Sequence, residues 1–345
     1  MNYLRKFAVQ ILLLEIVLLL TIISSEILYM PVSRLIRAVR HDIFRRSIVD
    51  EYIIGTDGVP SIDLGMIKSE YIGVQYVPVA VIQTGLQHYA EHDRASIDKF
   101  LNCTDLIIEK AVRKDSMAIL SYTYGYPVYN MNSPWRCAMA QGQALQLMTR
   151  ADEITGNPRY LAFGDSLMNL MLLSIEQGGV THKLTPSAWW YEEYADDHNR
   201  QIMVLNGMMF TLLGLHEFYT YTGSRKAALL FNNGINALLW QLPSYDRKGH
   251  SYYDILHTPA GGDYQQIHVT QLRELYEITG YEEFNYYHLK WEKFQNSPHL
   301  IQLFSAPPKM LIGVYLFIFV CLLILGELVT LFFWSKKKIV NREAN

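Results

Sequence analysis

The dipeptide Thr-Gly ends three amphipathic stretches of the chain, and each time a second amphipathic stretch follows at once. The dipeptides lie at 155–156, 222–223 and 279–280, and apolar residues on both sides recur at helical spacing. A helix that ends at a glycine in the left-handed conformation and is followed directly by another helix forms a helical hairpin. An earlier pair of helical patterns, at 79–92 and 96–112, adds a further hairpin.

These hairpins predict a mainly α fold. Repeated hairpins stack or close on themselves, so we expect an incomplete (α/α) toroid of about four helical hairpins, with an open superhelix as the alternative. Three long connections, 113–136, 178–201 and 243–264, would then gather at one end of the domain. Their length is typical of functional loops, and their aromatic residues argue against disorder. We expect small β insertions in them, for example a hairpin over 250–257.

Apolar residues concentrate at the two ends of the chain. Residues 7–25 contain one charge, Glu15, and residues 310–334 contain one charge, Glu327. Each stretch is long enough to span a bilayer. The first is longer than the apolar region of a usual signal peptide and lacks a clean cleavage site, which favours a retained helix. The lysine-rich residues 335–338 follow the second stretch and indicate a cytoplasmic C-terminus.

Two spans place both termini on one side of the membrane, and we expect the domain between them to lie outside the cytoplasm. The arginines after the first span favour the opposite orientation, but long domains cross membranes largely regardless of such charges. Glu15 and Glu327 could face one another or a partner helix, or Glu327 could lie near the interface. A membrane-protein partner or a homodimer is compatible with them. The predicted segments are a tail at 1–6, a transmembrane helix at 7–28, a linker and small N-terminal region at 29–75, the α/α toroid at 76–300, a transmembrane helix at 310–334 and a basic tail at 335–345.

Charge and cysteine content exclude several classes of protein. The chain has 30 basic and 33 acidic residues, far from the basic excess of a nucleic-acid-binding protein. Its 3 cysteines form neither a disulfide framework nor a metal-ligand spacing. The sequence also lacks a phosphate-binding glycine loop and a Ser-His-Asp pattern. We therefore expect no metal, no cofactor and no nucleic-acid partner.

Aromatic and carboxylate residues in the three connections are candidates for sugar chemistry. The sequence WYEEY at 190–194 places two carboxylates among aromatic rings, and Tyr-Asp and Asp-Tyr pairs follow at 253–254 and 263–264. Rings stack on sugars, amides and carboxylates bind hydroxyls, and Glu or Tyr side chains transfer protons. Taken alone, the two glutamates also fit a solvated turn, and each histidine fits a packed residue. The residues expected to bind substrate are Gln83, His88, Trp135, Gln141, Gln143, Tyr191, Glu192, Arg200, Asn206, Asp254, Asp263 and His268.

Several of these stretches resemble the C-terminal domain of the D-glucuronyl C5-epimerases, which convert glucuronate to iduronate within heparan-type polymers. The similar segments follow the family order over about 70–295. They include YVPVAVIQTGLQHYAEH at 76–92, SPWRCAMAQGQA at 133–144, WWYEEY at 189–194, VLNGMMFTLLGLHEF at 204–218, LPSYD at 242–246, YDI at 253–255 and DYQQIHVTQL at 263–272.

The resemblance implies catalytic roles for Glu193, Tyr194, Tyr253 and Tyr264. Inversion at C5 needs one group to remove a weakly acidic proton and another to return a proton on the opposite face of the carbon. A carboxylate in an aromatic enclosure gains a raised pKa through desolvation and an adjacent like charge. We expect Glu193 and Tyr264 to serve the two faces, with Tyr194 and Tyr253 tuning or sharing the proton transfer.

The chain departs from the family pattern where arginines would neutralise the substrate carboxylate. Leu256 and Gly261 occupy the arginine positions, Gly262 replaces a tryptophan, and Gln265 replaces a histidine. The alternative cations are Arg136, Arg200, Arg247 and Lys248.

The expected function is a membrane-tethered C5-epimerase that acts on uronate residues of a polysaccharide or a lipid-linked glycan. Its expected partners are a uronate-containing glycan and the lipid bilayer. A lyase is a second interpretation, because the same C5 carbanion can eliminate the C4 substituent. A third is a non-catalytic glycan-binding or scaffold module derived from the epimerase fold.

Overall fold

The structure, a computed structural model, divides the chain into two compact units, each with its own helices. One unit is built from the two ends of the chain and the other from the middle. The units comprise 1–45 with 294–345, and 46–293. The described residues are 2–44, 51–198, 201–305 and 309–343.

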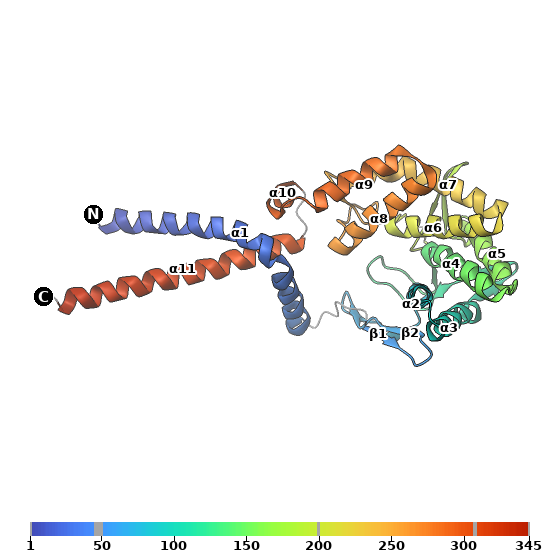
Figure 1. Cartoon of the computed structure of the whole chain (residues 1–345), viewed down its shortest axis with the longest axis horizontal. Coiled ribbons are helices and arrows are strands. Elements are labelled where there is room, and N and C mark those ends of the chain that lie inside the picture. The colour runs from blue at the N-terminus through green and yellow to red at the C-terminus, as the bar shows by residue number, and fades with distance from the viewer. Residues whose placement is uncertain (1, 45–50, 199–200, 306–308, 344–345) are drawn as a thin grey trace. The chain divides into compact units, whose positions relative to one another are not determined.

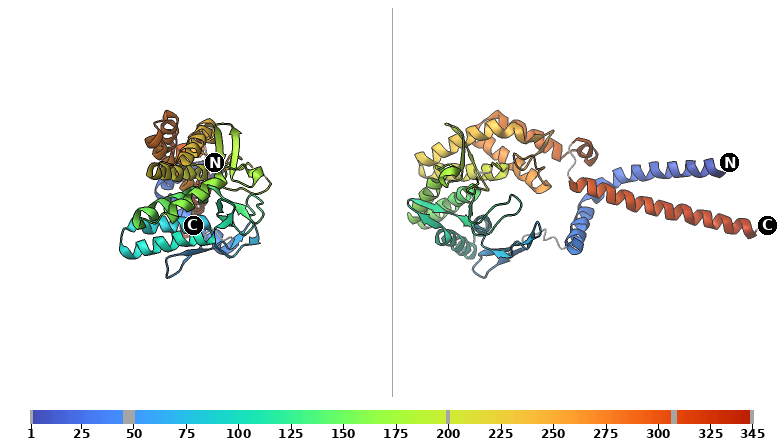
Figure 2. Two further views of the ribbon diagram at one scale, coloured as in Figure 1. Left: turned by 90° about the vertical axis from the view of Figure 1, so that its right-hand side faces the viewer. Right: turned by 180° about the vertical axis from the view of Figure 1, so that it is seen from behind.

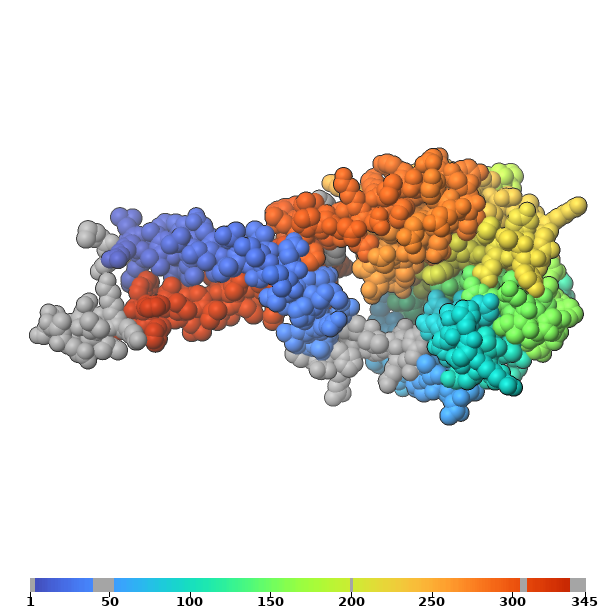
Figure 3. All heavy atoms as spheres, in the orientation of Figure 1, coloured from blue at the N-terminus to red at the C-terminus, as the bar shows by residue number. Residues whose placement is uncertain are grey.

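The unit built from the chain ends contains two long apolar helices. Helix α1 (Asn2–Phe44) packs along α11 (Lys309–Glu343), and the short α10 (His299–Ser305) contacts both. The two long helices run in opposite directions, and their side chains touch in the space-filling view (Figures 1 and 3). Segments Leu4–Val39 and Lys309–Ser335 are long and apolar enough to cross a membrane.

Helix α1 is longer than the sequence pattern predicts. It continues past residue 28 to Phe44, so the first part of the expected linker 29–75 is helical. Pro31 lies inside this helix, and α1 bends along its length (Figure 1). A proline inside a helix removes one hydrogen bond and displaces the preceding turn, which accounts for a bend.

The two carboxylates of the apolar helices do not face one another. Glu327 Oε2 on α11 accepts a hydrogen bond from Gln10 Nε2 on α1 at 3.4 Å. Glu15 instead lies on the exposed face of α1. An amide that pairs with the carboxyl satisfies both polar groups within an otherwise apolar helical hairpin.

The unit of residues 46–293 is built around consecutive helical hairpins, which follow one another along an arc (Figures 1 and 2). Contacts link α2 to α4, α4 to α6, and α6 to α8. The pairs are α2 (Pro78–Glu91) with α3 (Arg94–Lys110), α4 (Ala138–Thr155) with α5 (Arg159–Met171), α6 (Leu205–Thr222) with α7 (Arg225–Gln241), and α8 (Gly262–Thr279) with α9 (Glu282–Gln295).

The Thr-Gly joints have the predicted geometry. Gly156, Gly223 and Gly280 have φ values of 63°, 69° and 71°, and each N–H bonds the carbonyl four residues earlier. The threonine hydroxyl caps the same turn, because it donates to a carbonyl one turn back and accepts the N–H of the residue after the glycine. At the first hairpin His92 is left-handed instead, and Asp93 caps α3.

Close backbone approach joins the second and third hairpins. A Cβ atom on Gly214 of α6 would lie 2.0 Å from the Gly142 carbonyl oxygen of α4. Most of α4 is buried, including polar residues of its first turns. The expectation of a mainly α chain with two flanking apolar helices is confirmed, and closure of the hairpins into a toroid stays a prediction.

Small antiparallel β elements fill the connections, as the sequence predicts. The expected hairpin over 250–257 is shorter, because only 250–251 forms a strand there and pairs with 246–247. Ahead of α2 lie β1 (Glu51–Ile54), β2 (Pro60–Asp63) and β5 (Val74–Gln75) in one sheet, with β3 (Met66–Ile67) and β4 (Glu70–Tyr71) as a hairpin. The connections contain β6 (Val112–Lys114), β7 (Met117–Ile119), β8 (Ser121–Tyr122), β9 (Trp135–Arg136), β10 (Thr181–Thr185), β11 (Ala188–Tyr191), β12 (Asp246–Arg247) and β13 (His250–Ser251), with 3-10 turns η1 (Ile175–Gln177) and η2 (Leu242–Tyr245).

Candidate active site

A cleft of about 450 Å³ lies at the N-terminal ends of four helices. The first turns of α2, α4, α6 and α8 each contribute to its wall, and loops from the first two long connections complete it. The helices supply Val79, Ala80, Gln83, Met139, Asn206, Phe210, Asp263, Tyr264 and Ile267; the segments before and between them supply Ile62, Leu64, Val77, Tyr122, Tyr124, Tyr126, Trp135, Cys137, Glu193 and Tyr194.

Glu193 is a buried carboxyl that faces this cleft. Its side chain is 8% exposed, and Oε2 has no hydrogen-bond partner among the described residues. Burial raises the pKa of Glu193 to about 8, against a hydrogen bond from Tyr194, and the charge of Glu192 adds to the rise. A carboxyl of this kind changes its protonation state near neutral pH, which suits proton transfer.

Glu192 points the other way, into the interior. The two glutamates follow the end of β11, and Glu193 lies in a bend of the chain. Glu192 Oε2 accepts hydrogen bonds from the N–H groups of Ile202 and Met203 at 3.2 and 2.9 Å, and His182 lies 3.5 Å away. Glu192 therefore fixes the chain segment that leads into α6, and it does not line the cleft.

The catalytic candidates of the two later connections lie together. Tyr194 stacks on Tyr126 with ring centroids 5.2 Å apart, and Tyr253 meets Tyr264 edge-on at 4.6 Å. Tyr194 lies beside both Glu193 and Tyr253, so the phenols form a continuous group next to Glu193. Burial raises the pKa values of Tyr194 and Tyr253 well above the usual range. Both phenols are therefore neutral proton donors at neutral pH.

Among the expected substrate-binding residues, Gln83, Trp135, Asn206 and Asp263 line the cleft. Asn206 is 3% exposed, and no described residue forms a hydrogen bond with its Oδ1. Trp135 stacks on Tyr122 and donates from its indole nitrogen to the Tyr124 carbonyl at 2.8 Å. These groups offer an aromatic wall and free polar atoms, the combination that a sugar requires.

Gln141 and Gln143 are buried on α4, and their side chains bond to other parts of the protein. Gln141 bonds Leu120 N and Ala118 O, which holds the strand region of the first connection against the helix. Gln143 Oε1 lies 3.5 Å from Gln83 Nε2, so it reaches the cleft through that side chain.

His88 and Tyr191 lie away from the cleft. His88 bonds the Gly58 carbonyl through Nε2 at 3.1 Å, and the Tyr191 hydroxyl donates to the Leu230 carbonyl.

Asp254 and His268 are fully buried behind the cleft wall. Asp254 accepts hydrogen bonds from the Tyr129 hydroxyl at 2.8 Å and from Thr258 N at 2.9 Å. The Nδ1 atom of His268 lies 2.8 Å from Ser251 Oγ, and burial lowers the pKa of His268 to about 3. Both residues anchor the third connection, which carries Tyr253.

The alternative cations Arg136, Arg247 and Lys248 are not among the described residues that line the cleft. Arg136 bonds the Gly179 carbonyl and Asp197. Arg200 lies outside the described residues.

Tyr124, Tyr126, Tyr129 and Cys137 were not predicted from the sequence as residues of the site. Three of these line the cleft, and Tyr129 packs on Tyr194 with ring centroids 4.9 Å apart. The aromatic content of the first connection was the signal that could have found the tyrosines. Cys137 could not be predicted in the same way. Its side chain accepts a hydrogen bond from Ala140 N as the N-cap of α4, and this role is known only once the first residue of the helix is known.

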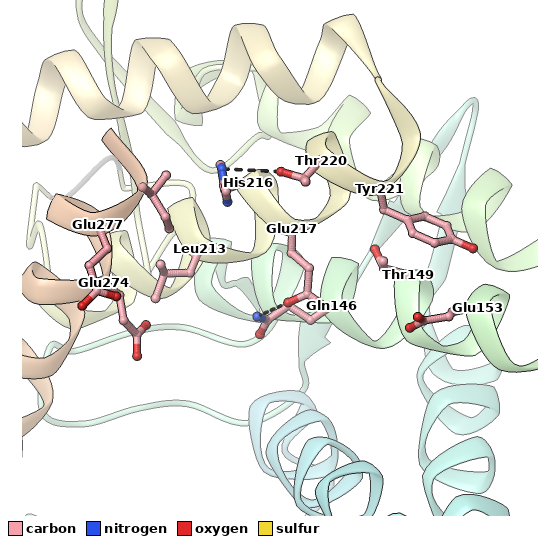
Figure 4. A pocket seen from close by; sticks show the side chains of 11 residues that line it. Gln146, Thr149, Glu153, Leu213, His216, Glu217, Thr220, Tyr221, Glu274 and Glu277 are labelled. Atoms are coloured by element: carbon pink, nitrogen blue, oxygen red, sulfur yellow. Dashed lines mark hydrogen bonds between the residues drawn. The ribbon is translucent and has the colours of Figure 1, made fainter. Parts of the chain in front are cut away.

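A larger cavity, of about 710 Å³, lies at the opposite ends of α4, α6 and α8 (Figure 4). Glu153, Glu217, Glu274 and Glu277 line it, and Glu217 accepts a hydrogen bond from Gln146 at 2.8 Å. None of the predicted catalytic residues is among the described residues that line this cavity. The smaller cleft, which contains Glu193 and Tyr264, is therefore the candidate active site.

The relatives that the chain matches include an uncharacterised archaeal protein and an animal enzyme. The chain is 27% identical to the uncharacterised protein MJ1128 of Methanocaldococcus jannaschii, over 66% of this chain and 80% of that protein. It is 28% identical to the D-glucuronyl C5-epimerase of Caenorhabditis elegans over 40% of this chain, and the match spans a quarter of that enzyme.

The structural matches are weaker. A cellobiose 2-epimerase from Bacillus thermoamylovorans has a TM-score of 0.46 and 10% identity, over 63% of this chain and 58% of that one. An α-mannanase from Bacteroides thetaiotaomicron has a TM-score of 0.46 and 10% identity, over 81% of this chain and 72% of that one.

A family model covers most of the residues that line the cleft. The model described as the D-glucuronyl C5-epimerase C-terminus matches residues 114–293, which include Glu193, Tyr253 and Tyr264. This match covers more than half of the chain's 345 residues. The chain therefore belongs to the D-glucuronyl C5-epimerase C-terminal family.

Proposed function

We propose that this protein epimerises uronyl units of a glycan at C5. The observation that carries the proposal is the position of Glu193, a buried carboxyl with an unpartnered oxygen in a cleft that Tyr264 also lines. The two groups come from different elements, the second connection and the start of α8. Two such groups can approach one carbon from different directions, as inversion of its configuration demands.

The reaction balances with these groups alone. One of Glu193 and Tyr264 takes the C5 proton, and the electron pair moves into the adjacent carboxyl group to form an enediolate. The other group then gives a proton to C5 from the opposite face, and the double bond reverts to the carboxyl group. Tyr194 lies beside Glu193, and Tyr253 packs on Tyr264, so these two phenols offer a route by which a proton returns between Glu193 and Tyr264 after each turnover.

The experiment uses the full chain, purified in detergent, with oligosaccharides of alternating glucuronate and N-acetylglucosamine in heavy water. We expect deuterium at C5 and the appearance of iduronate. Glu193→Gln and Tyr264→Phe are expected to remove exchange while the fold is retained, because each removes a proton-transfer group at little change in volume. An ultraviolet-absorbing unsaturated product would instead assign a lyase. Binding without exchange would assign a glycan-binding module.

We also propose that the two apolar helices tether the unit of residues 46–293 to a membrane, with both termini in the cytoplasm. The length and hydropathy of Leu4–Val39 and Lys309–Ser335 support this proposal. A cysteine-reactive, membrane-impermeant reagent tests it on intact cells. It should label a cysteine at exposed Tyr286 and leave one beside Lys6 unlabelled. The reverse pattern would overturn the orientation.

A further inference from the structure

Helix α8 begins at the cleft with two glycines, Gly261 and Gly262, and no capping side chain. Its N-cap is Gly261, with φ −68° and ψ 166°, and no side chain caps the helix. Gly262 is the first helical residue, and a Cβ atom at either glycine would meet nothing within 4 Å. Asp263 and Tyr264 follow in the same turn and line the cleft. A ligand can therefore approach the backbone N–H groups at this point.

Each of the other helices that start in the cleft has at least one N–H of its first turn bonded; on α2, Val79 N donates to the Tyr122 hydroxyl at 3.4 Å. On α4, Ala138 N donates to the Glu192 carbonyl, and Ala140 N donates to Cys137 Sγ. On α6, Leu205 N donates to the Tyr253 carbonyl. The first N–H groups of a helix lack intrahelical partners and form the positive end of the helix dipole. The start of α8 is consequently suited to an anion.

Buried polar atoms without hydrogen-bond partners among the described residues are a second indication that the same cleft binds a ligand. Within the part of the chain that the structure describes, Asn206 Oδ1 and Glu193 Oε2 are without hydrogen-bond partners, although the two residues are only 3% and 8% exposed. Buried polar atoms are nearly always hydrogen-bonded, because an unpaired one loses its hydration without replacement. Both atoms belong to the wall of the cleft that includes the start of α8. A sugar with hydroxyl groups would satisfy them.

We infer that the N-terminus of α8 binds the substrate's carboxylate through the backbone N–H groups of Gly262 and Asp263. The substrate is then a uronate in its free, charged form. This inference rests on the proposed function, because the carboxylate is the group next to the reacting carbon. Tyr264, whose phenol serves C5, is part of the same helical turn.

The chemistry favours such a site. Removal of the C5 proton turns a carboxylate with one negative charge into an enediolate with two, so the bound oxygens gain charge in the transition state. Fixed N–H donors at those oxygens stabilise that charge without reorganisation. The described residues of the cleft wall include neither Arg nor Lys, so the helix start supplies the positive potential there. Asp263 is exposed, and solvent screens its repulsion.

Gly262→Pro tests the inference, because proline removes one N–H and leaves the helix start intact. Proline is favourable at the first helical position. It also requires an extended residue before it, and the ψ of 166° at Gly261 fits that requirement. Gly262→Ala is the matched control, since it adds a side chain and keeps the N–H. Equal melting temperatures of the two variants would show that the fold is retained.

The probes are two forms of an oligosaccharide of alternating glucuronate and N-acetylglucosamine, the free acid and its methyl ester. The readout is kcat/KM for deuterium incorporation at C5, corrected for exchange without enzyme. We expect wild type to prefer the free acid. Gly262→Pro should lose about ten- to a hundredfold relative to Gly262→Ala on the acid, the range for a charge-assisted hydrogen bond. The loss on the ester should be smaller, because a neutral carbonyl binds an N–H more weakly.

A binding measurement separates this site from the chemistry. In the Glu193→Gln background, calorimetry with the free acid should show weaker binding after Gly262→Pro and little change after Gly262→Ala. Equal behaviour of the two Gly262 variants would overturn the inference, and so would a wild type that prefers the ester. Loss of acid preference in Arg200→Ala but not in Gly262→Pro would assign the role to the arginine. Exchange with neither probe would remove the proposed function, and the inference with it.

Discussion

The carboxyl group of Glu193 lies against the backbone of Gly207 on α6. A Cβ atom on Gly207 would be 2.3 Å from Glu193 Oε2 and 3.0 Å from Glu193 Cβ. Gly207→Ala should therefore displace the carboxyl and lower the exchange rate more than tenfold, because proton transfer depends on position at the scale of an ångström. The measurement is C5 deuterium incorporation, with the melting temperature as control. An unchanged rate would show that Glu193 can move without loss of function.

The pKa of Glu193 predicts the same pH profile for both directions of reaction. Burial raises this pKa to about 8. The two starting forms, Glu193 carboxylate with Tyr264 phenol and Glu193 carboxyl with Tyr264 phenolate, carry the same number of protons. We therefore expect kcat/KM to rise up to about pH 8 from glucuronate and from iduronate alike, because a protonated pair cannot accept the C5 proton. Initial rates from both epimers, measured between pH 6 and 9, test this. A flat profile up to pH 8 would contradict a proton-transfer role for Glu193.

The same carboxyl should make stability depend on pH. The folded state holds this proton up to about pH 8, and the unfolded state releases it near the usual glutamate pKa of 4.5. The stability that this group contributes is thus fully present below the unfolded-state pKa of 4.5, and it is lost as the pH rises towards the folded-state pKa of about 8. Glutamine does not titrate, so Glu193→Gln should not lose this stability. The free energy of unfolding of the variant, relative to wild type, should therefore be several kcal/mol higher at pH 8 than at pH 4. Melting temperatures across the range, for wild type and variant, provide the measurement.

Tyr129 and Asp254 connect two loops of the cleft through one hydrogen bond of 2.8 Å. Asp254 is fully buried beside Tyr253, so Tyr129→Phe should destabilise the protein by roughly 1.5–3 kcal/mol, the range for a hydrogen bond to a charged group. The rate should fall as well, because Tyr253 loses its support. A double-mutant cycle with Asp254→Asn should give a coupling above roughly 0.5 kcal/mol. Additive effects would show that the hydrogen bond does not couple the loops.

The crossing of α4 and α6 depends on Gly214. Its missing Cβ would lie 2.0 Å from the Gly142 carbonyl oxygen, a backbone atom that cannot turn aside. Gly214→Ala should destabilise the protein by roughly 1–3 kcal/mol, as overpacking does, despite the better helix propensity of alanine. Gly262→Ala, with open space around it, is the comparison. Chemical unfolding of both variants measures the difference.

The helical framework could be predicted because its signals are local. Each Thr-Gly joint specifies a helix end through the conformation of one residue, and Gly156, Gly223 and Gly280 all adopt it. The extension of α1 beyond residue 28 could not be predicted from hydropathy, because that stretch of the helix is less apolar and contains Pro31.

The cleft could be predicted only in part. Glu193, Tyr194, Tyr253 and Tyr264 were singled out by resemblance, and the structure brings them together. The direction of each polar side chain depends on packing that no local pattern encodes. Gln141 fits a helix surface by sequence, yet it is fully buried against the first connection.

The pairing of Gln10 with Glu327 also has a consequence for biosynthesis. The two residues are 317 positions apart, so α1 leaves the ribosome long before its partner helix exists. At ordinary translation rates this interval is on the order of tens of seconds. During that time the amide of Gln10 must be satisfied elsewhere, by water, lipid headgroups or an insertion factor. In a protein truncated before α11, helix α1 would lack the helix against which it packs, and Gln10 would lack Glu327.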